Sequence, residues 1–279
     1  MNKEKYIYQE IKSLERGFQV EVMLNHKPGA PLHWHEYFEV LYFVSGEADF
    51  FCGSERYTAK PGDFFIVNSN ELHSITGDSE NHYHICLRIS PQFFADVEFD
   101  NYIFTPYIQG DKQIKEYLEK IVEVWSAHEP AYDIEVKSIT YSLIAYLIKN
   151  HVASFLSDSA TQNRKNKLQT INEIVMHISK NYHTHMTTSS LAAKFHLTEQ
   201  YFCNIFKRAT GKTPIDYIND RRVRKSTVLL KTTDQSITDV ALSVGFDSSH
   251  YFTRVFKKYM GVSPREYRKG QISENNLVP

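Results

Sequence analysis

The sequence repeats itself in its C-terminal part. The segment YFCNIFKRATGKTP (201–214) aligns with YFTRVFKKYMGVSP (251–264) at an offset of 50 residues, and Tyr, Phe, Phe, Lys, Gly and Pro coincide. Upstream, LAAKFHLT (191–198) matches VALSVGFD (240–247) at an offset of 49, so the second copy has one extra residue between the two matches. A repeat of this length indicates two copies of one supersecondary unit.

Each copy predicts a helix, a tight turn and a second helix. In the second copy, Ser236 is expected to cap the first helix, Gly245 to allow the turn through a positive φ, and a new helix to begin near Ser248. The first copy carries His196 at the position of Gly245. The second helix of the later copy is expected to bury the apolar residues Tyr251, Phe252, Val255 and Phe256. A helix held in this way can project into a DNA major groove.

The charge of the chain differs between its two halves. Residues 164–279 carry 19 Lys and Arg against 9 Asp and Glu, a net charge of +10, whereas residues 1–163 carry 13 against 24, a net charge of −11. A basic C-terminal half favours a polyanion partner such as DNA.

The length of the chain, 279 residues, is enough for two domains. Its first residues, MNKEKYIYQE, lack the apolar core of a signal peptide, and the apolar stretch 38–44 is too short to span a bilayer. The cysteines, Cys52, Cys86 and Cys203, are widely spaced and odd in number, as is typical of reduced residues. We therefore expect a cytoplasmic protein without a membrane partner.

The N-terminal half predicts short strands followed by helices. Between residues 18 and 90, segments such as FQVEVML and HYHICLRIS are rich in aromatic and β-branched residues and alternate with turn signals, which predicts a small antiparallel barrel or sandwich. Apolar residues then recur at three and four positions over 114–125 and about 134–155, which predicts a helical hairpin. The polar segment 157–167 lacks such a period and is expected to be a linker.

The repeated units resemble a known family. GFDSSHYFTRVFKKYMGVSPREYR (245–268) is similar to the signature of the AraC/XylS family of bacterial transcription regulators, and the similarity extends from about Leu168 to Arg268. It includes a connecting helix expected over IDYINDRRVRKSTVLL (215–230). The resemblance implies two helix-turn-helix units that reach adjacent major-groove segments of double-stranded DNA.

The resemblance and the helical period select the same exposed positions in both second helices. We expect DNA contacts from Gln200, Cys203, Asn204, Lys207, Arg208, Ser249, His250, Thr253, Arg254 and Lys257. Arg254 suits bidentate recognition of guanine and Asn204 suits adenine. The basic residues Lys207, Arg208, Lys257 and Lys258 suit phosphates. Cys203 departs from the long polar residue expected at its position.

A histidine motif marks the N-terminal half. GAPLHWHEYFEVLYFVSG (29–46) contains the spacing H-x-H-x3-E-x6-G, and PGDFFIVNSNELH (61–73) ends in a further histidine. Strand alternation places the first two histidines and the glutamate on one face. The pattern resembles a cupin barrel, and the resemblance implies that four side chains meet inside it: His33, His35, Glu39 and His73. Asn68 and Asn70 stand where Pro and Gly are expected before the last of these.

Three interpretations of this barrel remain open. The first is a pocket for a small molecule, with a carbohydrate as the expected class, because aromatic faces beside a few polar groups suit sugar rings. Its ligand-binding residues would be His33, Trp34, His35, Glu39, Tyr42, His73 and Arg88. The second is a divalent transition metal held by the histidines and Glu39, for metal sensing or metalloenzyme activity; no other cofactor is expected. The third is a barrel that binds a partner protein.

These observations predict a two-domain α+β protein. Residues 1–156 form a cupin-like ligand-sensing and dimerisation domain with an N-terminal arm (1–20), residues 157–167 a linker, and residues 168–270 an all-α double helix-turn-helix domain. Ligand binding would change the packing of the arm or of the hairpin within 111–156, and so the presentation of DNA-binding units in a homodimer. We expect a transcription regulator that is no enzyme, with RNA polymerase as a partner if it is an activator.

Overall fold

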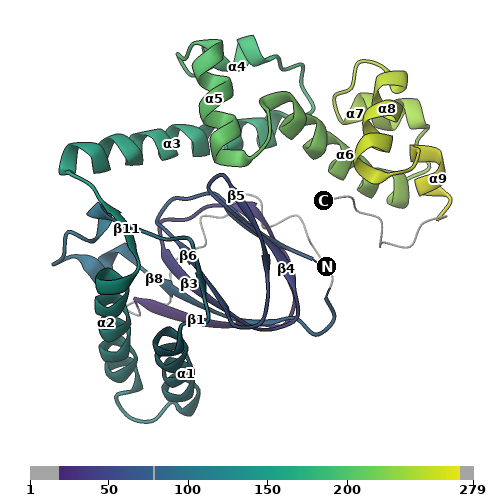
Figure 1. Ribbon diagram of the computed structural model, residues 1–279. Coiled ribbons are helices and arrows are strands. Elements are labelled where there is room, and N and C mark those ends of the chain that lie inside the picture. Colours follow the sequence, from purple (N-terminus) through teal and green to yellow (C-terminus); the bar gives the residue numbers. More distant parts are fainter. Residues whose placement is uncertain (1–18, 78, 271–279) are drawn as a thin grey trace. The chain divides into compact units, whose positions relative to one another are not determined.

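The computed structural model describes residues 19–77 and 79–270 and divides into two compact units, Met1–Gln169 and Thr170–Pro279. Most of the N-terminal arm expected from the sequence lies outside the described residues. No helix in the described part of the chain has the length and apolar character needed to cross a membrane. Figure 1 labels the elements along the chain.

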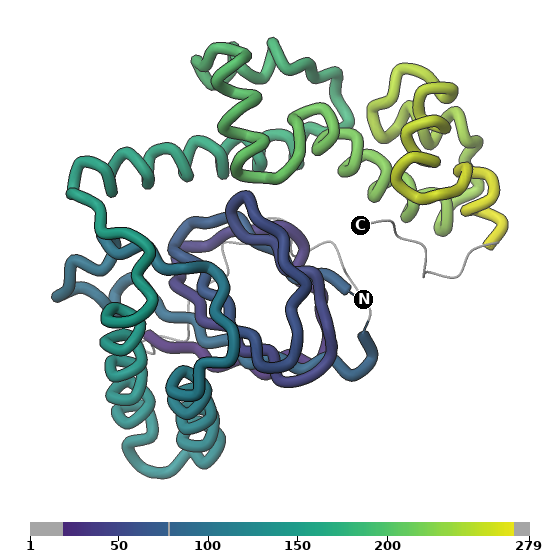
Figure 2. The backbone as a smooth tube through the Cα atoms, in the orientation of Figure 1, coloured from purple at the N-terminus to yellow at the C-terminus, as the bar shows by residue number. Residues whose placement is uncertain are grey.

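Two antiparallel sheets form the body of the first unit. The larger has five strands in the order β1 (Val20–Asn25), β8 (Tyr83–Ile89), β3 (Phe38–Ser45), β6 (Asp63–Val67) and β10 (Tyr107–Gln109). The smaller has four, in the order β2 (Ala30–His33), β7 (His73–Thr76), β4 (Ala48–Cys52) and β5 (Glu55–Ala59). The tube in Figure 2 shows the strands curling around a common interior. The predicted α+β fold is confirmed, although among the described residues these two sheets are not joined into one continuous closed ladder.

The five-stranded sheet has two apolar faces, because successive residues of a strand point to opposite sides. On the inner face, Leu41 and Phe43 pack with Phe50 and Phe65 in a core between the sheets. On the outer face, the intervening residues of β3 belong to a second core that includes helical residues. The polar residues of β3 and its neighbours therefore stand out against an aromatic interior.

A helical hairpin covers the outer face of the larger sheet. It consists of α1 (Lys112–Ala127) and α2 (Tyr132–Asn150), whose buried residues include Ile114, Leu118 and Leu143 in the same core as the strands. The sequence predicted that the second helix continues to Phe155, which is wrong. Residues Val152–Phe155 form the strand β11, which pairs with β9 (Tyr102–Phe104). In the chain, β9 follows two 3-10 turns, η1 (Pro91–Phe94) and η2 (Phe99–Asn101). Backbone pairing with β9 decides the conformation of this β-branched and aromatic segment.

The segment predicted to be a linker is helical. Residues 158–167 form the first turns of α3 (Asp158–Asn181). Polar contacts hold this part of the helix on the first unit: the Thr161 hydroxyl donates to Asn101 Oδ1 (2.8 Å), and Lys165 Nζ lies 2.6 Å from Asp100 Oδ2. A helix docked through polar side chains has no apolar period, which explains why the sequence pattern did not reveal it.

The second unit contains the repeat. Its helices after α3 are α4 (Thr188–Lys194), α5 (Glu199–Thr210), α6 (Pro214–Thr232), α7 (Ile237–Ser243), α8 (Ser249–Met260) and α9 (Pro264–Arg268). The pairs α4–α5 and α7–α8 are the two predicted helix-turn-helix units, and the long helix α6 lies between them in the chain.

Short sequence signals determine where these helices end and begin. Gly211 and Gly261 end α5 and α8 in the left-handed conformation, which glycine adopts without a Cβ penalty. Two residues later, the hydroxyls of Thr213 and Ser263 cap α6 and α9, and each cap is followed by a proline at the first helical position. The repeated G-x-[TS]-P therefore encodes a helix end, a turn and a helix start.

Candidate functional site

The second helices of the two helix-turn-helix units, α5 and α8, expose matching positions. The pattern of buried, half-buried and exposed residues is identical over 201–208 and 251–258. Most of the predicted DNA contacts are exposed: Gln200, Asn204, Lys207, Arg208, His250, Arg254 and Lys257. The remaining three are half-buried: Cys203, Ser249 and Thr253. Because the apolar side of each helix is buried in its own unit, the polar side remains available for a groove.

The turn before each of these helices has the same handedness. His196 adopts φ +55° and Gly245 adopts φ +93°, so a histidine takes the left-handed position at which glycine was expected. The predicted cap is present at the start of α7, where the Ser236 hydroxyl accepts the N–H of Asp239, and the hydroxyls of Thr198 and Ser248 likewise accept the backbone N–H of Tyr201 and Tyr251.

The basic residues of the two helices differ in their surroundings. Asn204, Lys207 and Arg208 line an open hollow of about 390 Å³ on α5. On α8, Lys258 lies 3.0 Å from the carboxylate of Asp216, and the hydrogen bond from Thr213 together with this ion pair lowers the pKa of Asp216. The first helix therefore presents its cations to an open surface, whereas Lys258 is engaged within the unit.

Tyr251 was predicted to be buried, and this is wrong. Its side chain is 38% exposed, at the edge of the apolar side of α8. The hydroxyl accepts a hydrogen bond from Asn219 Nδ2 (3.1 Å), and the ring faces the guanidinium of Arg254. Apolar periodicity cannot separate a tyrosine at the edge of a core from one inside it, so this arrangement leaves no signal in the sequence.

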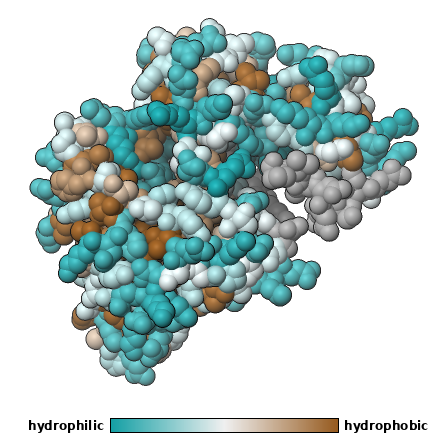
Figure 3. Space-filling model, in the orientation of Figure 1, coloured by the Kyte–Doolittle hydropathy of each residue, from teal (hydrophilic) through white to brown (hydrophobic). Residues whose placement is uncertain are grey.

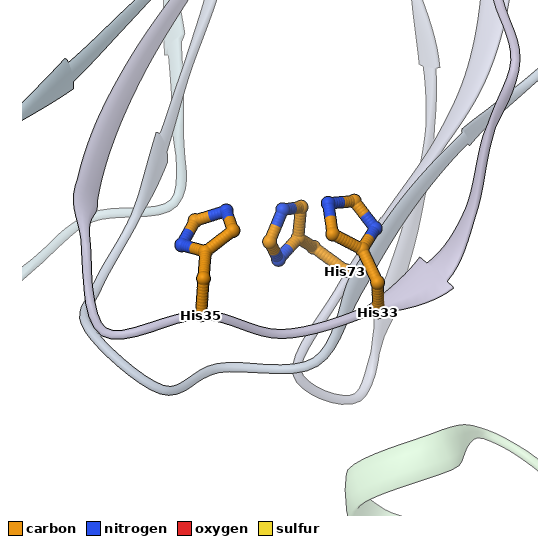
Figure 4. Close-up of side chains that lie close together, drawn as sticks. All are labelled: His33, His35 and His73. Atoms are coloured by element: carbon orange, nitrogen blue, oxygen red, sulfur yellow. The ribbon is translucent and has the colours of Figure 1, made fainter. Parts of the chain in front are cut away.

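In the first unit, four polar side chains predicted to meet inside the barrel lie close together. His33, His35, Glu39 and His73 are 7%, 4%, 2% and 1% exposed. Glu39 connects them, since its Oε1 lies 2.9 Å from His35 Nε2 and its Oε2 lies 3.4 Å from His73 Nε2. Figure 4 shows the three imidazole rings side by side.

The three histidines share one pattern of hydrogen bonds. The Nδ1 atoms of His33, His35 and His73 lie 2.7, 3.3 and 2.9 Å from backbone carbonyl oxygens two residues away. A ring that donates from Nδ1 keeps a lone pair on Nε2. His35 Nε2 and His73 Nε2 are buried without a hydrogen-bond partner, because their contacts with Glu39 lack hydrogen-bond geometry. Buried polar atoms of this kind are costly unless a ligand satisfies them.

Glu39 and Arg88 face each other on β3 and β8. Arg88 Nε donates to Glu39 Oε1, and Arg88 Nη1 lies 3.6 Å from Glu21. Burial alone would raise the pKa of Glu39, but the charges of His35 and Arg88 outweigh it and hold that pKa well below its usual value. Burial lowers the pKa of His33 and His35. The cluster thus combines an ionised carboxylate and a guanidinium with two imidazoles, His33 and His35, whose charged forms are disfavoured by burial.

These residues fit a divalent transition metal in part. One ring nitrogen from each of the three histidines lies within 4.8 Å of the others, and neutral imidazoles suit such ions. Glu39, the fourth expected ligand, is engaged by Arg88. The arrangement therefore offers three nitrogen ligands, with a carboxylate beside them that is already paired.

Asn68 and Asn70, which depart from the cupin motif, still support the cluster. Asn70 adopts φ +64°, a left-handed conformation that asparagine tolerates, and its N–H donates to the His35 carbonyl (2.9 Å). Asn68 is buried and its Oδ1 accepts the N–H of Phe104 (3.0 Å). The substitutions therefore keep the loop before His73 in place.

Two of the other predicted ligand residues differ in position. Trp34 is half-buried between the two histidines of β2 and the loop that follows it. Tyr42 is three residues from Glu39 and so points to the opposite face, where it stacks on Phe64 with ring centres 4.6 Å apart. The structure does not bring Tyr42 together with the histidines. Tyr37, which follows the histidine pair in the sequence, is a further aromatic neighbour, with its ring centre 5.6 Å from that of His35.

Comparison with known proteins places both units. The family described as AraC-like ligand binding domain matches residues 25–144, and the family described as Helix-turn-helix domain matches residues 191–270. An uncharacterized HTH-type transcriptional regulator, YdeC of Bacillus subtilis, is 28% identical over 86% of this chain and 86% of its own length. The chain belongs to the AraC/XylS family of transcriptional regulators.

Other relatives of this AraC/XylS regulator cover most of its length. The melibiose operon regulatory protein of Escherichia coli is 23% identical over 88% of this chain and 86% of its own length. The HTH-type transcriptional activator RhaS of Mannheimia succiniciproducens is 23% identical over 85% of this chain and 89% of its own length. The relatives are regulators of transcription, and their likeness extends over both units.

The AraC/XylS chain also has a contact that the sequence did not reveal. Glu71 Oε1 accepts a hydrogen bond from Arg164 Nη2 of α3 (2.6 Å), and the Glu71 carbonyl oxygen lies 2.9 Å from His73 Nδ1. Glu71 Oε2 also accepts from Asn68 Nδ2 (3.2 Å). One residue thus contacts both the histidine cluster and the first half of α3.

Proposed function

We propose that this regulator binds a specific double-stranded DNA site through α5 and α8 and responds to a small carbohydrate in the N-terminal unit. The observation that carries the effector proposal is the buried polar cluster, in which two imidazole nitrogens face the Glu39 carboxylate but have no partner in good hydrogen-bond geometry. Hydroxyl groups of a sugar can donate to such nitrogens, while the half-buried rings of Trp34 and Tyr37 suit its CH faces. The similarity to a melibiose operon regulator supports this ligand class.

The DNA contacts are proposed position by position. Arg254 recognises a guanine and Asn204 an adenine, since their side chains have the required donor and acceptor geometry. The remaining exposed or half-exposed positions contact base edges or sugars, and the basic residues neutralise phosphates. These two groups are, respectively, Gln200, Cys203, Ser249, His250 and Thr253, and Lys207, Arg208 and Lys257.

The effector signal has a physical route within the first unit. A ligand that draws in His73 would displace the Glu71 backbone and with it the carboxylate that holds Arg164 of α3. Residues of α3 beyond Gln169 belong to the second unit. Ligand binding would therefore shift the population of α3 arrangements, as any regulatory ligand must favour one state.

The assembly is proposed to be a cytoplasmic homodimer that regulates transcription and performs no catalysis. On the face shown in Figure 3, apolar side chains gather around β11, where Phe155 is 58% exposed. Ile134 and Tyr141 of α2 are also exposed, by 67% and 50%. These side chains are available to a second copy of the hairpin, and RNA polymerase is the partner if the protein activates.

Thermal unfolding of the full chain tests the effector proposal. It is recorded against mono- and oligosaccharides, including galactosides, and against divalent metals. A ligand held at 100 times its dissociation constant stabilises the fold by about 2.7 kcal/mol, which is a shift of several degrees. His35→Ala and Trp34→Ala should abolish the shift, whereas a change of the exposed His185 should preserve it. A shift that survives both substitutions would place the ligand elsewhere.

The second candidate is a transition-metal sensor or metalloenzyme, favoured by the three histidine nitrogens within 4.8 Å. A thermal shift with metal and none with sugars, together with one metal ion per chain after dialysis, would support it. His73→Ala should then remove the metal. Metal content below a tenth of an equivalent would reject this candidate, and no shift with any compound would favour a protein partner for the barrel.

A further inference from the structure

Arg254 is an exposed side chain on α8, and a free arginine must lose rotamer freedom before it can recognise a base. An arginine side chain carries roughly 2 kcal/mol of rotamer entropy. In this structure the guanidinium is not free, because its central carbon lies 5.2 Å from the centre of the Tyr251 ring. This distance is within the range of a cation–π contact, which restricts the arginine before DNA arrives.

Tyr251 is itself held in place from two directions. Its hydroxyl accepts a hydrogen bond from Asn219 Nδ2 at 3.1 Å, and Asn219 is only 6% exposed on α6. The edge of its ring meets Phe246, with centres 5.9 Å apart and planes at 64°. Phe246 is 2% exposed, so the tyrosine rests on the core of the unit. The ring is therefore a fixed platform for the guanidinium.

We propose that Tyr251 and Asn219 are positioning residues that orient Arg254 for base recognition. The proposal rests on the base-contacting role given to Arg254 above. Asn219 fixes the tyrosine, the tyrosine ring fixes the guanidinium, and the guanidinium meets the base with less entropy left to lose. The two residues thereby contribute to sequence preference without contacting a base edge.

The first helix-turn-helix unit, α4–α5, provides a matched control. Tyr201 occupies the position of Tyr251 at the offset of 50 residues, and it is 49% exposed. The residue three positions later is Asn204, which has no cationic group to place on the ring. Tyr201→Phe therefore removes the same hydroxyl from the matched position of α5, without an arginine to disturb.

The test uses a DNA duplex selected from a random pool with the wild-type full-length protein. Binding is measured to this duplex and to each of its single-base variants, so that a preference profile is obtained for every position. Arg254→Ala identifies the base pair that Arg254 recognises. Tyr251→Phe removes the hydroxyl that Asn219 holds and keeps the ring, while Asn219→Ala removes the other partner. Thermal unfolding verifies that each variant is folded.

We expect Tyr251→Phe and Asn219→Ala to weaken preference by about 3- to 10-fold, the worth of one hydrogen bond, at the Arg254 base pair alone. Tyr201→Phe should leave that base pair unchanged. In the Arg254→Ala background, Tyr251→Phe should have no further effect, because the residue acts through the arginine.

The outcomes separate the two proposals. If Arg254→Ala changes no base preference, both the role of Arg254 and its positioning are overturned. If Arg254→Ala changes the profile but Tyr251→Phe does not, only the positioning is overturned. A uniform loss of affinity for all sequences in Tyr251→Phe would mean that its hydroxyl binds a phosphate, and would also overturn the positioning.

Discussion

The two helix-turn-helix units solve the same geometric problem with different residues. Both turns contain one residue with positive φ, but it is His196 between α4 and α5 and Gly245 between α7 and α8. A Cβ added to Gly245 would lie 2.8 Å from backbone atoms of His183. His196 is exposed. The left-handed conformation alone thus tolerates a histidine, and glycine is required where another backbone segment approaches closely.

This difference shows that a missing glycine does not argue against a turn. Histidine is among the residues enriched in the left-handed region, at a cost that the surrounding unit can offset. The cost of a side chain beside His183 is of another kind, because backbone atoms cannot move aside without shifting the chain between α3 and α4. The two turns should therefore respond very differently to substitution.

The largest effect is expected at Gly245. Gly245→Ala combines left-handed strain with a clash against His183. It should destabilise the second helix-turn-helix unit, α7–α8, by roughly 2–4 kcal/mol. Urea unfolding of the full chain measures the loss, and amide hydrogen exchange in α7 and α8 localises it. Gly261→Ala is the control, since Gly261 also has positive φ but its Cβ would meet nothing within 4 Å. It should cost only about 1 kcal/mol.

Equal losses in these two alanine variants would contradict the proposed role of the His183 backbone. The conformational strain would then account for the whole effect, and the contrast between Gly245 and His196 would lie in the side chain of histidine.

An intermediate and symmetrical effect is expected at the helix caps. Thr198 and Ser248 each accept the N–H three residues later, at 3.3 and 3.4 Å. Thr198→Ala and Ser248→Ala should each cost about 1 kcal/mol, because each leaves one helix N–H unsatisfied. Exchange rates at the first turns of α5 and α8 report the two losses separately. A difference above about 1 kcal/mol between the caps would show that the units are not equivalent in stability.

Much of the compact unit that contains both helix-turn-helix units could be predicted from its sequence, because its signals are local. The repeat, the caps and the G-x-[TS]-P turns depend on neighbours within a few residues. Tyr251 could not be assigned, since its hydrogen bond to Asn219 joins residues 32 positions apart. The same limit explains the linker: the contacts of α3 with Glu71 and Asp100 span many residues and leave no periodic trace.

The histidine cluster was predictable for a different reason. His33, His35 and Glu39 are close in sequence, and alternation plus the cupin pattern identified His73. Arg88 was selected only as a ligand residue, and its pairing with Glu39 was not predicted, because it depends on the register of β3 and β8, which places the two residues directly opposite each other. Tyr42 was predicted to line the pocket, but it is three residues from Glu39, and strand alternation therefore places it on the outer face of the sheet. The strands β9 and β10, three residues each, were too short to give any pattern.

The smallest effect is expected when the first turn is converted to the second. His196→Gly removes left-handed strain of about 1 kcal/mol. It also gives the unfolded chain more freedom, which costs about 0.4–1 kcal/mol. The two terms oppose each other, so the stability should change by less than about 0.5 kcal/mol in urea unfolding. Affinity for the selected duplex should also stay within about twofold, because the turn keeps its handedness.

A gain in stability well above about 1 kcal/mol would mean that His196 stores more strain than its open surroundings imply. A clear loss would mean that its side chain makes a stabilising contact, and glycine would then be the poorer residue in this turn despite being required in the other.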